Sequence, residues 1–242
     1  YAEITPRYDG DCSMRLPDGR CILHAELGED ALAHVCRLYP RGIRLEPGYE
    51  CSLANSCEAV LELLFEKADP ISFCHRELSF GKLPAHKRNY TFSLMEKEIE
   101  IRLWLIAHIQ NRTLSLPERL MSLGLSLQKL EQALSLQDAS TLEALLRSPF
   151  PTDFLVLDTG PEHLAFGLHT MAALSRQLDE RSDSLRIYGE KAQAYFSTHF
   201  NPESGSPSTD NFDNYTVAKE HFETAFPKWE LWFEHMLVNH MF

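Results

Sequence analysis

The apolar residues of this chain recur mostly at the three- and four-residue spacing of an amphipathic helix. The clearest case is the segment 115–134, whose leucines stand at positions 120, 123, 127, 130 and 134. These positions return to one side of a helix, and Pro117 suits its first turn. The same reasoning predicts further helices over 92–112, 138–147, 162–179, 183–198 and 229–242.

The first 75 residues follow a different pattern, rich in turn sequences. The Asp-Gly steps before Cys12 and Cys21 predict turns, and the second predicts a short hairpin that brings the two thiols together. A helix is expected over 25–37, ending before Pro40. A loop or short hairpin is expected over 41–50, and a helix within 52–67 that begins near Ser52 or Ser56.

The segment 67–90 combines turn residues and charges, which predicts a linker between two domains. We therefore expect a cysteine-cluster module over 1–75 and a helical domain over 88–242. A weak strand pattern stands at 154–158, and residues 201–211 have the composition of a loop. The expected fold class is mainly α, with an irregular cysteine-rich metal-binding module followed by a helical domain.

Composition and charge narrow the functional classes. The chain has 242 residues, 44% of them hydrophobic, which is enough to fill a core. Its formal net charge of −12 argues against nucleic-acid binding and permits a basic protein partner. No apolar run approaches the roughly 18 residues of a membrane span. The chain begins at Tyr1 without a methionine, which suggests a piece of a longer protein.

The six cysteines all lie in the first third of the chain, at positions 12, 21, 36, 51, 57 and 74. Disulfides, reduced structural thiols and a metal site all remain open, and disulfide-dense chains are usually small and secreted. The spacing contains neither the CxxC step common in zinc sites nor CxxxCxxC. Four of the cysteines fall in predicted turns or at predicted helix ends, where thiols can converge, which favours the metal site.

Other candidate groups have a structural and a functional interpretation. Arg102, Gln110 and Arg112 lie on or near one apolar helix, where they either form a satisfied buried network or line a pocket. Trp229, Trp232 and Phe233 are core residues or the wall of a site for a cationic amine or sulfonium. The chain has no HExxH, GxGxxG or P-loop motif.

Several blocks of the chain resemble a known family. The chain resembles the flagellin lysine-N-methylase family, which is related to the iron- or zinc-chelating cysteine-cluster proteins. At the front, the similar blocks are "DCSMRLPDGRCILHAELGEDALAHVCRLYPRG" and "ECSLANSCEAVLELL". In the helical part, they are "IRLWLIAHIQNRTLSLPERLMSLG" and "FEHMLVNHMF". Relative to the family, this chain lacks an earlier cysteine-rich stretch and the part that follows the last block.

The resemblance assigns candidate residues position by position. It implies a metal site at the family's cysteine positions, which are Cys12, Cys21, Cys36 and Cys57, whereas Cys51 and Cys74 match none. Arg119 also matches the family. The pattern departs at Ser13 and Met14, where the family has proline and phenylalanine, and at Glu58, where it has proline. The residues that we expect in a substrate or donor pocket are Tyr39, Arg41, Arg102, Gln110, Arg112 and Asn239.

The resemblance implies a bacterial, cytoplasmic enzyme that transfers methyl groups from S-adenosylmethionine to lysines of flagellin. The cysteines would hold either an iron–sulfur cluster or zinc, and no catalytic residue or base can be named. Flagellin is the expected partner; nucleic acid and membrane are not. The alternatives are a non-catalytic, metal-stabilised helical module that binds a partner protein, and a thiol redox protein without metal.

Overall fold

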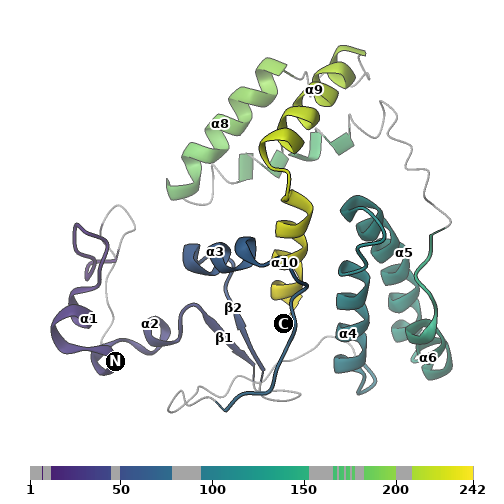
Figure 1. Cartoon of the computed structure of the whole chain (residues 1–242), viewed down its shortest axis with the longest axis horizontal. Helices are drawn as coiled ribbons and strands as arrows, with labels where there is room; N and C mark the ends of the chain where they lie inside the picture. The colour runs from purple at the N-terminus through teal and green to yellow at the C-terminus, as the bar shows by residue number, and fades with distance from the viewer. Residues whose placement is uncertain are drawn as a thin grey trace. The chain divides into compact units, whose positions relative to one another are not determined.

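A computed structural model describes residues 7, 12–44, 50–77, 94–152, 166–167, 169–171, 173–174, 176–177, 183–199 and 209–241. It divides into two compact units. The first comprises Tyr1–Ala33 and Asp158–Pro227, and the second comprises His34–Leu157 and Lys228–Phe242. Both are mainly helical (Figure 1), as predicted. No helix in the described part is long and apolar enough to cross a membrane.

The first unit contains a tight turn followed by short helical pieces. Arg15 and Cys21 form an antiparallel bridge around the turn, which confirms the hairpin itself; that it brings the thiols of Cys12 and Cys21 together stays a prediction. Helix α1 (Ile22–Leu27) and the 3₁₀ turn η1 (Glu29–Ala31) follow. The later helices of this unit are α8 (Asp183–His199) and α9 (Thr209–Ala225).

The single helix predicted over 25–37 is wrong, because the chain breaks it twice. Gly28 has φ +82° and ψ −176°, a backbone conformation that belongs to no helix and that glycine tolerates best. Leu32 is extended and ends η1. Helix α2 (His34–Leu38) then starts in the second unit. The apolar stripe that suggested one helix is not buried, since Val35 is 73% exposed.

The second unit begins with a hairpin and a short helix. Strands β1 (Arg41–Arg44) and β2 (Glu50–Leu53) pair antiparallel, with Arg41 opposite Leu53, which confirms the hairpin alternative. Helix α3 (Glu58–Glu66) follows β2. Cys57 is its N-cap rather than a residue of its first turn.

Three helices in the middle of the second unit lie side by side (Figure 1): α4 (Glu98–Ile109), α5 (Leu116–Ser135) and α6 (Ala139–Arg147). Helix α5 begins with a capping box, in which the Ser115 backbone N–H and hydroxyl both donate to the Glu118 carboxylate. One core cluster joins these helices through Ile101, Trp104, Leu130, Ala133, Leu134 and Leu142.

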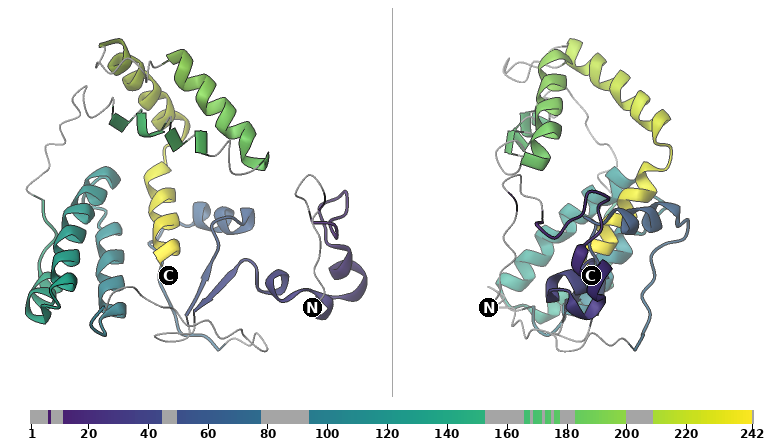
Figure 2. Two further views of the ribbon diagram at one scale, coloured as in Figure 1. Left: turned by 180° about the vertical axis from the view of Figure 1, so that it is seen from behind. Right: turned by 90° about the vertical axis from the view of Figure 1, so that its left-hand side faces the viewer.

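The last helix, α10 (Trp229–Met241), packs against α3, α4 and β2 (Figure 2). Val238 of α10 is fully buried in a second cluster with Ile106, Ile109 and Leu123. Helix α10 is thereby packed against residues that lie more than a hundred positions earlier in the chain.

The predictions for α5, α6, α8 and α10 are confirmed within a few residues at each end. Helix α4 is shorter than the predicted 92–112, because Met95 and Glu96 have positive φ angles before its start. Helix α9 was not predicted, since its many Asn, Asp and Thr residues favour caps and turns. The predicted strand 154–158, and most of the predicted linker, lie outside the described residues.

Candidate functional site

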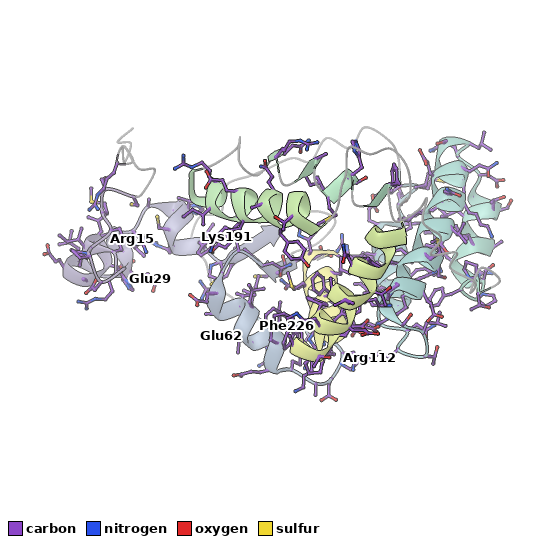
Figure 3. The ribbon with its side chains drawn as sticks, turned by 90° about the horizontal axis from the view of Figure 1, so that it is seen from above. Arg15, Glu29, Glu62, Arg112, Lys191 and Phe226 are labelled. Carbon is purple, nitrogen blue, oxygen red and sulfur yellow. The ribbon has the colours of Figure 1, made fainter. Side chains whose placement is uncertain are left out.

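Glu234 of α10 is the centre of a buried ion-pair network. Arg112, in the loop before α5, donates from Nε to both carboxylate oxygens at 3.1 and 3.0 Å, and from Nη2 to Oε1 at 2.7 Å. A third nitrogen of Arg112 binds the Ala68 carbonyl at 2.9 Å. Figure 3 shows the Arg112 side chain at α10. The loop, α10 and the segment after α3 are thus held together by one guanidinium.

Arg119 of α5 reaches the same carboxylate from the other side. Its Nη1 donates to Glu234 Oε2 at 2.6 Å and to the Ile109 carbonyl at 2.6 Å. Its Nη2 lies 3.4 Å from Glu230 Oε2, an oxygen that also accepts from the Leu116 backbone N–H at 3.0 Å. Arg119 and Glu234 are 3% and 1% exposed, so both charges are sheltered from solvent.

The protonation of this network follows from its geometry. Burial disfavours the Glu234 carboxylate, but hydrogen bonds from Arg112 and Arg119 outweigh that effect and lower the pKa of Glu234. The Glu234 contact raises the pKa of Arg112 in return. The buried Arg119, the more exposed Arg112 and the carboxylates of Glu234 and Glu230 therefore balance in charge. A balanced, hydrogen-bonded set of this kind can hold helices in place without a ligand.

His235 extends the network through both of its ring nitrogens. Its Nδ1 lies 2.7 Å from the Leu64 carbonyl, which can only accept, so Nδ1 carries the proton. Its Nε2 lies 3.3 Å from Arg112 Nη2, which can only donate, so Nε2 is the acceptor. Nδ1 thus joins α10 to α3, and Nε2 joins α10 to the loop before α5.

The other predicted residues of the helical part also join segments together. Arg102 of α4 forms a salt bridge with Glu50 of β2. Asn239 of α10 donates to the Leu53 carbonyl and to Asn55 Oδ1, each at 2.6 Å. Gln110 at the end of α4 donates to the Ile71 carbonyl at 2.8 Å. Arg102, Gln110, Arg112 and Asn239 thus hold the segment 50–71 against α4 and α10.

A cavity of about 580 Å³ lies between α4, α5 and the end of α10. Its apolar lining consists of Leu94, Ile101, Leu105, Leu127, Leu130, Leu134 and Met241. The polar lining consists of Glu98, Arg102, Glu131 and Ser135. Of the residues that the sequence predicted for a pocket, Arg102 alone belongs to this lining. The volume and the apolar character are those of a small-molecule site.

A serine and a histidine also meet in the core, at Ser126 and His108. His108 Nε2 lies 3.1 Å from Ser126 Oγ, and its Nδ1 lies 3.1 Å from the Trp104 carbonyl. Burial lowers the pKa of His108 to about 4, so the ring is neutral at pH 7. The two side chains are 2% and 1% exposed, so no substrate can reach them. This pair is a satisfied core contact between α4 and α5.

The cysteines predicted as metal ligands are split between the two units. Cys12 and Cys21 belong to the first unit, and Cys36 and Cys57 to the second. Within the residues that the structure describes, no three His, Cys, Asp or Glu side chains are grouped to hold a metal ion, and all six thiols are free. The four-cysteine ligand set stays a prediction.

The hairpin of the second unit contains Arg41 in β1 and Cys51 in β2, and Tyr39 lies just before it. The Tyr39 hydroxyl lies 3.4 Å from Ser56 Oγ and the residue is half exposed. Arg41 stands at the start of β1, opposite the end of β2. Burial raises the pKa of the Cys51 thiol, and the Arg41 guanidinium partly offsets this rise. A thiol with a raised pKa is a poor nucleophile and a poor metal ligand at neutral pH.

Sequence reasoning missed the acidic partners of the predicted arginines, namely Glu50, Glu230 and Glu234. The available signal for Glu234 was its place at the front of the block "EHMLVN", which also carries Asn239. Glu50 and Glu230 gave no comparable signal, because each is one of many acidic residues in an acidic chain. Their roles appear only when the segments meet.

Comparison with known proteins identifies the helical part of the chain. A family model described as the FliB lysine N-methylase C-terminal domain matches residues 102–242, which is more than half of the chain. The match begins at Arg102 and includes Arg112, Arg119 and Glu234, whereas all six cysteines precede it. No curated protein and no solved structure showed significant similarity to the chain.

Proposed function

The chain belongs to the FliB lysine N-methylase family, and we propose that it transfers methyl groups from S-adenosylmethionine to lysine ε-amines of flagellin. The observation that carries this proposal is the family match over 102–242. Further support comes from the buried ionic network, which fixes the matched residues Arg112 and Arg119 against α10. A rigid frame of this kind suits an enzyme that must position two substrates.

In the proposed reaction, the lone pair of the lysine nitrogen attacks the methyl carbon of S-adenosylmethionine. The bond between this carbon and sulfur breaks, and its electron pair remains on sulfur to give S-adenosylhomocysteine. The amine then loses a proton. Because a free lysine has a pKa of about 10.4, the amine must first be deprotonated or desolvated at neutral pH. No described side chain is assigned as the base.

The protein's acidity supports a lysine-bearing substrate. A net charge of −12 attracts basic surfaces at low ionic strength, which raises the rate of encounter. The apolar walls of the cavity between α4 and α5 would exclude water from a bound reactant, which strengthens charge interactions there. These are contributions that the described residues themselves can make to methyl transfer.

The metal centre remains part of the proposal on the strength of the sequence alone. Cys12, Cys21, Cys36 and Cys57 occupy positions that match the family's cysteines, and four thiolates suit either zinc or an iron–sulfur cluster. No step of the proposed methyl transfer depends on this centre. Metal content and methyl transfer can accordingly be measured as separate properties.

The proposal is tested by incubating the chain with purified flagellin and methyl-labelled S-adenosylmethionine. Mass spectrometry should detect mass increments of one or more methyl groups on flagellin lysines. Reactions without the methyl donor, and reactions with heat-denatured chain, serve as controls. Unmodified flagellin after prolonged incubation, together with retained binding of flagellin, would contradict the methylase and support the non-catalytic binding module.

A further inference from the structure

We propose that the cavity between α4, α5 and the end of α10 is the binding site for the methyl donor, and that its carboxylates select the sulfonium donor over the neutral product. This inference rests on the proposed methyl transfer, because it names the place where one of the two substrates binds. It assigns a role to Glu98 and Glu131, which the sequence did not single out, and to Leu127, which was predicted only as part of a helical stripe.

The shape of the cavity suits a nucleoside-containing ligand. Its volume of about 580 Å³ falls within the range of about 300–1,000 Å³ that small-molecule sites occupy. A lysine side chain alone would leave most of this space empty. The floor includes Ile101 and Leu130, each 5% exposed and part of the core cluster. A floor made of core residues is rigid, so the site exists before the ligand arrives.

The charges around the cavity favour a cationic ligand. Arg102 is paired with Glu50, so its charge is largely balanced. Glu98 of α4 and Glu131 of α5 also line the cavity, and neither side chain has a hydrogen bond or ion pair with another described residue. The lining consequently carries an excess of negative charge beside an apolar surface. A ligand with an apolar body and a net positive charge matches both features.

S-adenosylmethionine has this combination, and its product does not. The donor carries a sulfonium, an ammonium and a carboxylate, for a net charge of +1 at neutral pH. S-adenosylhomocysteine has lost the sulfonium charge and is neutral overall. Unpaired carboxylates near the sulfur should therefore bind the donor more tightly than the product. Because Glu131 is exposed and Glu98 is half-buried, solvent screening limits this preference to about threefold to tenfold.

The lysine side chain of flagellin is also a cation with an apolar stem, so it is the alternative occupant of this cavity. A donor site and a lysine site predict different binding of S-adenosylmethionine. A donor site binds S-adenosylmethionine in the absence of flagellin, whereas a lysine site binds no donor by itself. Titration calorimetry of the chain alone with S-adenosylmethionine, its stable amine analogue sinefungin, and S-adenosylhomocysteine separates these cases. We expect the two cationic ligands to bind at least threefold more tightly than S-adenosylhomocysteine.

Two leucines of α5 provide a matched steric test. Leu127 is 41% exposed and lines the cavity, whereas Leu120 is 42% exposed and does not. Leu127→Trp should fill the cavity and weaken sinefungin binding at least tenfold, with a matching rise in the KM for the donor. Leu120→Trp should change neither value by more than about twofold. Circular dichroism and thermal melting show whether each variant keeps the fold.

The electrostatic test removes charge without changing shape. Glu131→Gln and Glu98→Gln should each reduce the preference for sinefungin over S-adenosylhomocysteine about threefold, and leave S-adenosylhomocysteine affinity within about twofold. Glu62→Gln, on the exposed face of α3, removes one carboxylate outside the cavity and should leave the preference unchanged (Figure 3 labels Glu62). These variants keep the proposal testable even if Leu127→Trp fails to fold.

The results of these experiments distinguish a failure of the donor-site proposal from a failure of the proposed methylase function. Flagellin methylation with equal donor binding by Leu127→Trp and Leu120→Trp would overturn the donor site and leave the methylase standing. An unchanged ligand preference in both glutamine variants would overturn the charge selection. A wild-type chain that neither binds the donor nor methylates flagellin would overturn the proposed function, and the donor site with it.

Discussion

Arg119 of α5 donates a 2.6 Å hydrogen bond to Glu234 of α10, although the two residues are 115 positions apart in the chain. Both side chains are almost completely buried, and Arg112 binds the same carboxylate from the other side. Three charges thus meet at a point where α10 crosses the beginning of α5. Loss of either partner at this junction should be costly, because it leaves a buried charge without compensation.

Glu234→Gln should destabilise the second unit by about 3–5 kcal/mol, because it leaves the buried Arg119 charge with reduced compensation in the interior. Urea unfolding followed by circular dichroism measures the change. Glu143→Gln is the matched control, since Glu143 pairs with Arg147 at the surface, where both side chains are at least half exposed. Its cost should stay below about 1 kcal/mol. Equal effects of the two substitutions would contradict the role of the network.

The contribution of Glu234 should depend on pH in a defined direction. Since the folded-state pKa of Glu234 is lowered, its stabilising effect is fully present above the unfolded carboxyl pKa of about 4.3. The effect is lost as the pH falls through the lower folded value. The difference in unfolding free energy between wild type and Glu234→Gln should therefore be constant from pH 5 to 7 and shrink below pH 4. A difference that grows on acidification would refute this assignment.

His108 should make the fold sensitive to acid in a higher pH range. Its folded pKa of about 4 lies below the ordinary value of 6.5, so the unfolded chain takes up a proton first. Acidification from pH 6.5 to 4 should cost about 3 kcal/mol through this group. His108→Gln should flatten that part of the stability profile, whereas the exposed His240→Gln serves as the control. An unaltered profile in His108→Gln would show that desolvation at this site is weak.

Two glycines should respond to alanine in opposite directions. Gly28→Ala forces a side chain onto φ +82° and ψ −176°, which should destabilise the first unit by about 1–3 kcal/mol. Gly124 lies inside α5 with nothing within 4 Å of an added methyl group, so Gly124→Ala should stabilise the protein by about 0.5–1 kcal/mol. Differential scanning calorimetry measures both. A stabilising Gly28→Ala would show that the break between α1 and η1 is not required.

The cysteine prediction is tested by metal analysis of anaerobically purified chain. Iron with sulfide and broad absorbance near 400 nm would indicate an iron–sulfur cluster, and one zinc in a colourless protein a structural site. Cys36→Ala should lower the metal content and the melting temperature, because ligand loss uncouples metal binding from folding. Cys74→Ala, which removes an exposed thiol outside the predicted set, should change neither. Identical metal content in both variants would reject the four-cysteine set.

The local signals in the sequence determined most of the helices. Helix α5 follows from leucines at helical spacing, and the Ser115–Glu118 capping box that starts it joins residues three positions apart. The hairpin turn before Cys21 follows from an Asp-Gly step in the same way. The sequence also singled out Arg112, Arg119 and Asn239 through their resemblance to a family, and the family match over 102–242 covers these three positions.

The tertiary structure decided which partners these residues have. The pattern over 25–37 resembled one helix, but Leu27 and Val35 remain exposed and the chain breaks at Gly28. Glu234 could not be paired with Arg112 and Arg119 beforehand, because the chain contains 35 acidic residues and 23 lysines and arginines. Caps and turns depend on residues a few positions apart, so the sequence contains them directly. An ion pair across 115 residues and a cavity between three helices exist only once packing has brought the helices together.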